Sequence, residues 1–464
     1  MLLEINSGDT AWVLISAALV FFMTPGLALF YGGMVRAKGA LNMMMMSFIS
    51  IGTIGVLWIL VGFSMAFGED IGGGLLGDPF QFFGLNGLFG ENAGAFLDPE
   101  ATGPVGIPAI AFVGFQAAFA IIATALISGA IADRASFGGW TLFTIFWGLL
   151  VYFPAAHWVF DFGGITNDAG VTTQNPGILA GWGVYDFAGG TAIHINAGAS
   201  ALALALVLGP RIGFNQKPMR PHNLTLVMLG AAILWFGWFG FNAGSAVAGN
   251  GLAGFAWVNT LGATCAAMIG WLIVEKVRDG HPTSLGAASG IVAGLVAITP
   301  SCSTVEPWAA LLIGLVAGVV CAFAVGLKYK LGYDDSLDVV GVHLVGGLIG
   351  TILIGFFASP NAPGIGDGLG LFYGGGLEQL GKQVTGAVCV MLYGFVVSYI
   401  IGFVIKKTLG WRVSPAAELG GIDLAEHSEI GYDLSPVYYT SRVQRTLVLT
   451  KDDMPETTKT GDPR

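Results

Sequence analysis

Two histidines, His194 and His343, each lie inside a glycine-rich apolar segment that opens with an aspartate. The segments read DFAGGTAIHINAG (186–198) and DVVGVHLVGG (338–347). An ionisable side chain inside a membrane-spanning helix is costly to place there, so it indicates a functional site. Histidine also gains and loses its proton near neutral pH. Two histidines in corresponding places therefore predict a proton-handling conduit. Helix packing and ligation of haem iron are the alternatives.

Small and acidic residues accompany both histidines. Glycines lie four residues before and after His194 and four residues after His343, on the same helix face as each ring. Glycine at these positions allows close helix packing and leaves room beside the ring. Asp186 and Asp338 are expected to cap free N–H groups at helix starts. Direct binding of a cation by Asp186 is the alternative role.

Two groups of aromatic residues could form a cation site. Phe115 and Phe119, in FQAAF, lie one helical turn apart, and Trp238, Phe241 and Ser245, in GWFGFNAGSA, share another helix face. Aromatic faces attract cations, and a serine oxygen accepts a hydrogen bond from an N–H group. Ordinary packing explains each group alone. Together with the histidines, they favour an ammonium-like ion over an alkali ion, which has no proton to donate.

The elements that position these residues are apolar helices. Of 464 residues, 54% are hydrophobic and only 10% are charged, far too few charges for a soluble domain of this size. We predict an all-α polytopic membrane protein, with a membrane domain at 1–408 and a polar tail at 409–464. Eleven apolar runs have about the length that crosses a bilayer: 11–34, 41–67, 106–131, 137–159, 186–209, 224–247, 252–274, 285–302, 307–327, 338–358 and 381–405.

Charge and parity predict the topology. Among basic residues near the ends of these runs, only Lys382 falls on the opposite side from the others. The positive-inside rule then places the N-terminus outside and the tail in the cytoplasm. Eleven spans divide into two units of five and one further span. Because five is an odd number, the second unit crosses the membrane in the opposite orientation to the first. His194 and His343 fall in the last span of each unit, which predicts an inverted repeat with its site at the interface of the two copies.

The chain resembles the ammonium transporter (Amt/Rh) family along nearly its whole length. The resemblance runs from PGLALFYGGMVRAK to LGWRV and includes both histidine segments, GWFGFNAGSA and RPHNL. It implies an eleven-span protomer in the cell membrane, assembled as a homotrimer in which each protomer has its own pore. Ammonium or ammonia would be the transported molecule.

The resemblance also implies a role for each candidate residue. Phe115 and Ser245 would belong to an outer recruitment site, supported by Asp186 and Trp238, and Phe119 and Phe241 would form a gate beneath it. The two histidines would line the pore as a hydrogen-bonded pair. We therefore expect ammonium to be recruited, deprotonated and conducted as ammonia through an apolar pore.

One residue departs from the family pattern. The aromatic cage of the outer site usually includes a tryptophan where this chain has Phe160, in HWVFDFGG. Phenylalanine offers a smaller cation–π surface and no indole N–H. Trp158, two residues earlier, should face another way if the helix continues. Phe160 is expected to complete the recruitment site. Because it replaces the usual tryptophan, the affinity of that site for ammonium does not follow from the resemblance.

The tail contains AELGGIDLAEHSEIGYD (417–433), which resembles the family segment that packs under the trimer and takes part in docking a PII-type signalling protein. Ser428 stands where glycine is usual. A solvated acidic tail without a partner is the alternative, and it is the expectation for 434–464.

Several other functions remain as alternatives. The chain could be an Rh-like channel for neutral gases, an ammonium sensor, or a membrane protein that binds haem through His194 and His343. The residues do not decide between electrogenic ammonium transport and net ammonia conduction. No nucleophile, phosphate loop or metal-ligand cluster indicates an enzyme, a cofactor, a metal site or a nucleic-acid partner.

Overall fold

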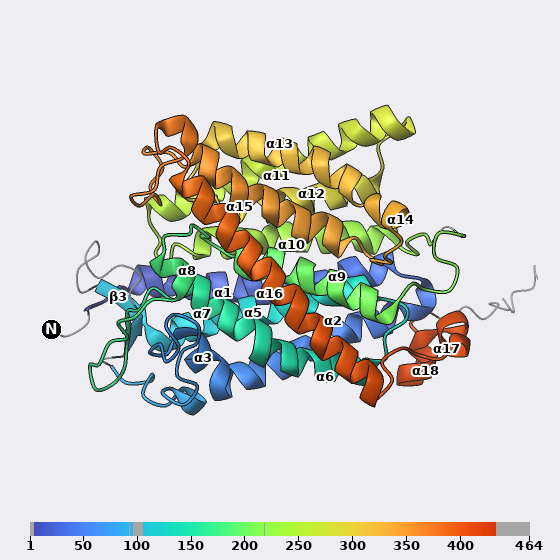
Figure 1. Ribbon diagram of the computed structural model, residues 1–464, viewed down its shortest axis with the longest axis horizontal. Coiled ribbons are helices and arrows are strands. Elements are labelled where there is room, and N and C mark those ends of the chain that lie inside the picture. The colour runs from blue at the N-terminus through green and yellow to red at the C-terminus, as the bar shows by residue number, and fades with distance from the viewer. Residues whose placement is uncertain (1–3, 92, 96–104, 218, 433–464) are drawn as a thin grey trace, which may run out of the picture. The chain divides into compact units, whose positions relative to one another are not determined.

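In the computed structural model, long apolar helices form most of the described chain, which comprises residues 4–91, 93–95, 105–217 and 219–432 (Figure 1). Residues up to 431 belong to one unit, and all elements named below lie in it. Of the predicted tail, 409–464, the residues from 433 onward, and with them the predicted acidic part 434–464, lie outside the described residues. Large apolar side chains such as Phe22, Ile59 and Phe236 are exposed on the helices, as expected for a surface that faces lipid.

The part of the unit up to residue 160 is helical apart from three short strands and its loops. Its helices and strands are, in chain order: β1 (Glu4–Ile5), α1 (Ser7–Met34), η1 (Ala37–Gly39), α2 (Ala40–Leu57), η2 (Trp58–Gly62), α3 (Phe63–Phe67), η3 (Phe83–Leu85), β2 (Gly94–Ala95), β3 (Val105–Pro108), α5 (Ala109–Ile127), η4 (Ser128–Ile131), α6 (Phe137–Trp147), η5 (Gly148–Tyr152) and α7 (Phe153–Phe160).

The part from residue 165 onward adds one more short strand and is otherwise helical apart from its loops. Its elements are: β4 (Ile165–Thr166), α8 (Ile178–Gly181), η6 (Gly190–Ile195), α9 (Asn196–Leu208), α10 (Leu224–Gly244), α11 (Gly251–Asp279), α12 (Ser284–Ile298), α13 (Pro307–Ala324), α14 (Leu327–Leu331), η7 (Val340–Leu344), α15 (Val345–Phe357), η8 (Leu371–Tyr373), α16 (Glu378–Thr408), α17 (Pro415–Gly420) and α18 (Ile422–His427).

A helix occupies each predicted span, but the helices differ in length. Ten of the helices in the described residues are long and apolar enough to cross a membrane. The predicted eighth span, 285–302, is instead the 15-residue helix α12, which ends at Ile298. Nearly all of its residues are buried. Because α12 is shorter than the usual bilayer-crossing length, the count of eleven spans stays a prediction.

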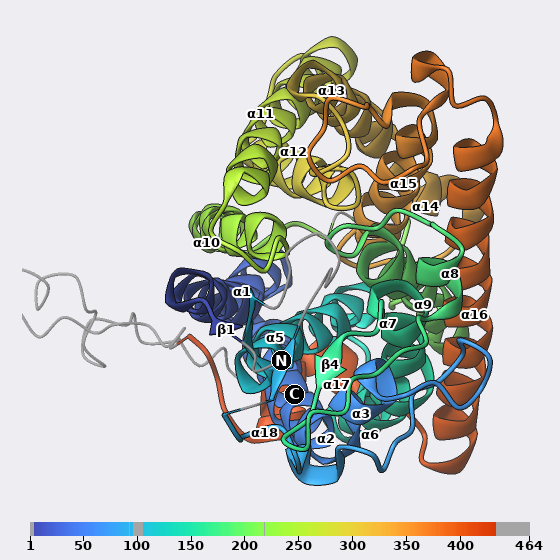
Figure 2. The same cartoon turned by 90° about the vertical axis from the view of Figure 1, so that its left-hand side faces the viewer.

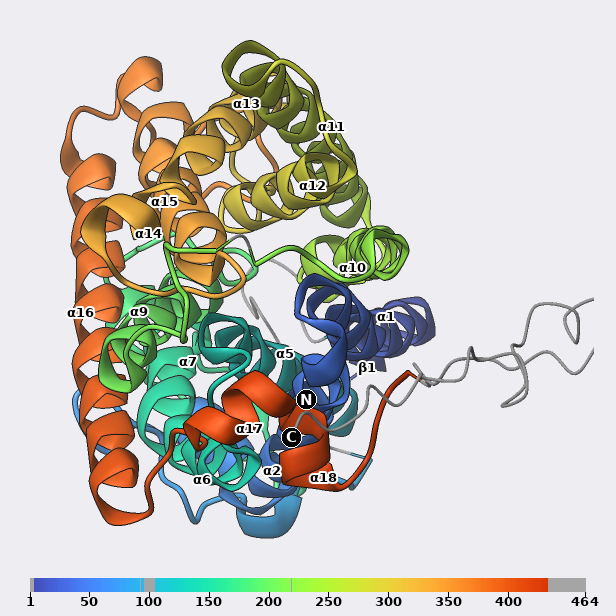
Figure 3. The same ribbon diagram turned by 90° about the vertical axis from the view of Figure 1, so that its right-hand side faces the viewer.

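The helices form two groups that follow the predicted halves. Figures 2 and 3 both show α10 to α15 on one side and α1 to α9 on the other, with α16 running beside both groups. The last span of each half contains a π-helix, η6 or η7, and each histidine lies within it. π-Helical turns inside helices are rare and occur frequently at functional sites. The inversion of one half relative to the other stays a prediction.

Glycines let helices of the two halves pack closely. A Cβ added at Gly230 of α10 would lie 2.4 Å from the backbone nitrogen of Phe30 in α1, and one at Gly198 of α9 would lie 2.5 Å from that of Leu344 in η7. Neither position can accept a larger residue unless the backbones separate. The glycine beside His194 is therefore part of the contact between the two histidine-bearing segments.

The two ends of the helix unit differ. At one end, four short strands pair in the order β1-β3-β2-β4, with β1 parallel to β3 and the other pairs antiparallel. At the other end, residues 409–431, here called the C-terminal clasp, include α17 and α18 and lie close to α2 (Figure 3). The clasp carries most of the described part of the predicted tail.

Candidate functional site

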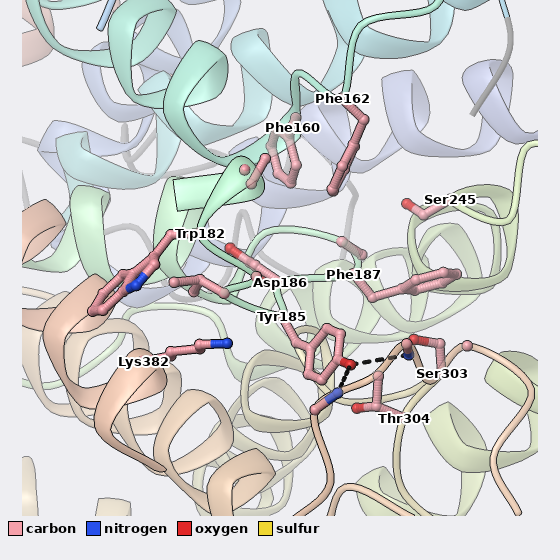
Figure 4. A pocket seen from close by; sticks show the side chains of 18 of the residues that line it. Phe160, Phe162, Trp182, Tyr185, Asp186, Phe187, Ser245, Ser303, Thr304 and Lys382 are labelled. Carbon is pink, nitrogen blue, oxygen red and sulfur yellow. Dashed lines mark hydrogen bonds between the residues drawn. The ribbon is translucent and has the colours of Figure 1, made fainter. Parts of the chain in front are cut away.

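A pocket of about 550 Å³ brings together all three residues predicted for recruitment, Phe115, Phe160 and Ser245. We call it the aromatic pocket (Figure 4). Phe115 is fully buried at its base, whereas Phe160 and Ser245 are half-buried. The Ser245 hydroxyl donates to the carbonyl of Phe241 at 2.8 Å. Its oxygen therefore keeps lone pairs that can accept a hydrogen bond from a ligand.

The pocket is also lined by five aromatic residues that the sequence did not indicate: Phe112, Phe162, Trp182, Tyr185 and Phe187. Phe162 lies next to Phe160, and Trp182, which is 45% exposed, lies across the pocket from them (Figure 4). Trp158 does not line the pocket; its indole N–H donates to the carbonyl of Leu75 at 2.8 Å. The expectation that Trp158 faces elsewhere is confirmed. The spacing of Trp182 gave no signal because it lies in an irregular loop.

Asp186 lies in the wall of this pocket, and its carboxylate holds the start of η6. It accepts hydrogen bonds from the backbone N–H groups of Gly189, Gly190, Thr191 and Ala192, and from the Thr191 hydroxyl. Gly189 has φ +120°, a conformation that favours glycine, so the helix begins at Gly190 and not at 186. These five hydrogen bonds satisfy both oxygens of the Asp186 carboxylate without a bound cation.

The equivalent residue in the second half is Asp335, and the expectation for Asp338 is wrong. Asp335 accepts from the N–H groups of Val339 and Val340 at 3.1 and 2.7 Å, whereas Asp338 pairs with Lys328 at 2.6 Å. Asp335 precedes its histidine by eight residues, as Asp186 does. That shared spacing was the signal in the sequence. It was missed because Asp338 lies directly at the start of the apolar run.

A column of five aromatic rings leads inward from the aromatic pocket. Its consecutive ring centroids are 4.8, 4.4, 6.0 and 5.4 Å apart, and we call it the ring column: Phe115, Phe119, Phe241, His194 and His343. The two predicted gate residues lie in the middle, and each is about 1% exposed. The structure thus brings Phe115 of the predicted recruitment site, both predicted gate residues and both predicted pore residues into one continuous series.

The two histidines are in contact at the inner end of the column. Their Nδ1 atoms are 3.4 Å apart, and both rings are buried. His194 Nε2 has no hydrogen-bond partner among the described residues. Two ring nitrogens in hydrogen-bond contact leave no space for a porphyrin between them, and the adjoining cavity measures only about 10 Å³. This geometry contradicts the haem alternative.

Trp238 lies next to His194 and lines the same small cavity. Its ring stacks on the imidazole with centroids 5.4 Å apart, and its N–H donates to the Thr299 hydroxyl at 2.8 Å. The sequence placed Trp238 in support of the recruitment site. In the structure its contacts orient the first histidine and Phe241 instead.

The cavities continue beyond the histidines to a second large pocket. The cavity beside His194 shares Phe30 and His343 with a further small cavity. That cavity in turn shares Asp338 with a pocket of about 490 Å³, here called the basic pocket because Arg211, Lys217 and Lys328 line it. Shared lining residues therefore connect the cavity beside His194 to the basic pocket, whereas that cavity and the aromatic pocket share no lining residue and are separated by the phenylalanines of the ring column.

Comparisons with known proteins agree with one another over almost the whole chain. The model of the Ammonium Transporter Family matches residues 11–432. An ammonium transporter of Mycobacterium bovis is 57% identical over 440 residues, which cover 93% of this chain and 91% of the relative.

Solved structures are similar in fold as well as in sequence. The crystal structure of Saccharomyces cerevisiae Mep2 matches with a TM-score of 0.80 and 32% identity, and the match covers 94% of this chain and 93% of that one. A structure named Sensor Amt Protein matches with a TM-score of 0.80 and 30% identity over 90% of this chain and 98% of that one. The helical arrangement described above is therefore one that these proteins share.

Proposed function

Because the chain belongs to the ammonium transporter family and transports ammonium, we propose that it captures the ion in the aromatic pocket, removes its proton there and conducts ammonia along the ring column. The observation that carries the proposal is the column itself. It begins at Phe115 in the wall of the aromatic pocket and ends at His343, beyond which cavities reach the basic pocket.

Capture depends on a site that suits a small cation with N–H groups. The faces of Phe115 and Phe160 provide negative charge density, and the free lone pairs of Ser245 accept a hydrogen bond. Asp186 keeps the pocket wall in place through its bonds to the start of η6. An alkali ion of similar charge has no N–H to donate, so the hydroxyl favours ammonium by its hydrogen bond.

Deprotonation is the less costly way past the phenylalanines. Ammonium has a pKa of roughly 9, so removing its proton at pH 7 costs about 3 kcal/mol, at about 1.36 kcal/mol per pH unit. Carrying an unpaired charge into an apolar, water-free constriction costs several times more. Phe119 and Phe241 are almost fully buried and offer no polar group to replace water. Ammonia therefore crosses this constriction, and we propose that the proton released in the pocket is relayed separately by way of His194 and His343, so that net transport carries charge and gives a current.

The histidine pair supplies hydrogen bonds where the column is otherwise apolar. Besides His194 and His343, the one polar side chain lining the small cavity among the described residues is Trp238, whose N–H is already donated to Thr299. Neutral imidazole has one nitrogen that donates and one that accepts. Ammonia, which does both, is stabilised next to the pair.

Replacing Ser245, whose hydroxyl accepts a hydrogen bond from the captured ion, tests the proposal. Ser245→Leu should raise the ammonium concentration that gives half-maximal current in proteoliposomes by at least tenfold, or abolish the current, because the hydroxyl is lost and the pocket is filled. Ser245→Thr, which keeps the hydroxyl, is the matched control. A Ser245→Leu protein with the wild-type apparent affinity would refute this placement of the capture site.

The proposal also covers the assembly and the regulation of the protein. We infer a homotrimer in the cell membrane, with the clasp end in the cytoplasm and available to a PII-type protein. Native mass spectrometry of the detergent-extracted protein tests the trimer. Pull-down with a PII protein, with and without nucleotide and 2-oxoglutarate, tests the partner; the absence of binding in every condition would remove it from the account.

A further inference from the structure

The rim of the aromatic pocket carries a fixed positive charge. Among the described residues that line the pocket, Lys382 of α16 is the one cationic side chain, and Asp186 and Asp367 are the acidic ones. The Lys382 side chain is 22% exposed. Figure 4 shows it extending from α16 toward Tyr185 in the pocket. A cation at the entrance of a site that attracts cations opposes occupancy of that site.

Lys382 is not required to hold the pocket together. The neighbouring glutamines hold the pocket wall by hydrogen bonds. Gln379 donates to the carbonyl of Gly183 at 3.1 Å, and Gln383 accepts from the N–H of Tyr185 and donates to its carbonyl, each at 2.8 Å. The partner of Lys382 is Glu378, one turn earlier on α16, at 2.9 Å. The Glu378 side chain is 77% exposed, and exposed pairs of this kind contribute little to stability.

We propose that Lys382 sets the affinity of the aromatic pocket for ammonium by electrostatic repulsion, and that Glu378 and Asp367 oppose its effect. This inference rests on capture of the charged ion in the pocket. Lys382 does not touch the ion and acts only through its charge. Its effect on ammonium affinity must therefore weaken as salt screens the pocket. Removing a positive charge must raise the affinity, and removing a negative charge must lower it.

Apparent affinity measured at two ionic strengths tests the proposal. In proteoliposomes with ammonium at or below millimolar concentration, the ammonium concentration for half-maximal current is compared in about 10 mM and about 500 mM sodium chloride. Screening reaches about 30 Å in the first medium and only a few ångströms in the second. At low salt, Lys382→Gln should lower this concentration about two- to fivefold, with the maximal current unchanged.

Charge-matched variants separate electrostatics from shape. Lys382→Arg should behave as wild type, whereas Asp367→Asn and Glu378→Gln should raise the half-maximal concentration at low salt, and all differences should vanish at high salt. Glu378 lies outside the pocket lining, so its variant gives an answer even if Lys382→Gln does not fold. Equal affinities at low salt, or differences that persist at high salt, would overturn the role of Lys382 while leaving ammonium capture intact. A wild-type protein without ammonium current would instead overturn the proposed function and this inference with it.

Discussion

At the scale of single residues, the ring column depends on side chains held by specific hydrogen bonds. Trp238 contacts both His194 and Phe241, and its own position is held by the bond to Thr299. The Thr299 hydroxyl in turn donates to the carbonyl of Leu295 at 2.7 Å. A buried donor that loses its acceptor keeps its full desolvation cost. The indole of Trp238 is therefore sensitive to the residue at 299.

Removing the acceptor of Trp238 should affect both stability and transport. We expect Thr299→Val to destabilise the protein by about 1–3 kcal/mol and to reduce the ammonium current, because the indole that packs on His194 loses its anchor. Thr299→Ser retains the hydroxyl and should remain close to wild type. Thermal unfolding in detergent and current in proteoliposomes provide the two readings. Equal behaviour of the valine and serine variants would show that the bond is unimportant.

At the scale of elements, the two spans that bear histidines begin in the same way. Asp186 and Asp335 each hold the N–H groups of a π-helical turn, and each histidine follows eight residues later. Burial raises the pKa of Asp335 to about 6, against the opposing effect of nearby Lys328. The ordinary value for aspartate is about 3.9. The native state thus binds this proton more tightly than the unfolded chain does.

That shift gives a pH dependence with a defined sign. The contribution of Asp335 to stability is complete below about pH 4 and is lost as the pH rises through about 6. Asp335→Asn removes it, so the thermal midpoint of the variant should vary less than that of wild type between pH 4 and 7. The exposed Asp367→Asn variant should retain the wild-type slope. An unchanged slope in Asp335→Asn would contradict the assignment.

The sequence predicted the helices and which residues of the ring column share a helix face, whereas the contact between the two histidines was implied only by the resemblance to the family. Apolar runs are long and helical spacing is regular, so Phe115 with Phe119 and Phe241 with Ser245 could be placed on common faces. Tertiary contacts decided the rest. Asp335 lies outside its apolar run, and Lys382 enters the pocket from the helix farthest away in sequence. The sequence did mark both residues, Asp335 by its spacing from His343 and Lys382 by the charge pattern, but neither signal shows which atoms the side chain contacts.

At the scale of the whole molecule, the C-terminal clasp joins elements that are distant in sequence. Asp423 accepts from the N–H groups of Leu41 and Asn42 in the first turn of α2, at 3.1 and 2.7 Å. Glu426 accepts from Phe137 N–H at the start of α6, at 2.8 Å. Carboxylates at helix N-termini satisfy free donors and suit the helix dipole. The clasp thus caps α2, and at α6 it adds to the cap that Ser136 provides to Gly139 N–H.

Loss of one of these caps should release the clasp. We expect Asp423→Ala to lower stability by about 0.5–2 kcal/mol and to increase hydrogen exchange at 409–431 and in the first turn of α2. Glu429→Ala changes an exposed acidic residue of the same segment and should have no such effect. Mass-spectrometric hydrogen exchange on the purified protein measures both. Protection of the clasp that is identical in Asp423→Ala and wild type would contradict its role as a cap.

The account as a whole rests on ammonia passing the histidine pair. Its most direct test is the current evoked by ammonium, and by potassium, in proteoliposomes that contain His194→Ala or His343→Ala. We expect each variant to lose most of the ammonium current or its discrimination against potassium, because the column then loses one of two touching polar rings. Unchanged current together with unchanged discrimination in both variants would contradict the account.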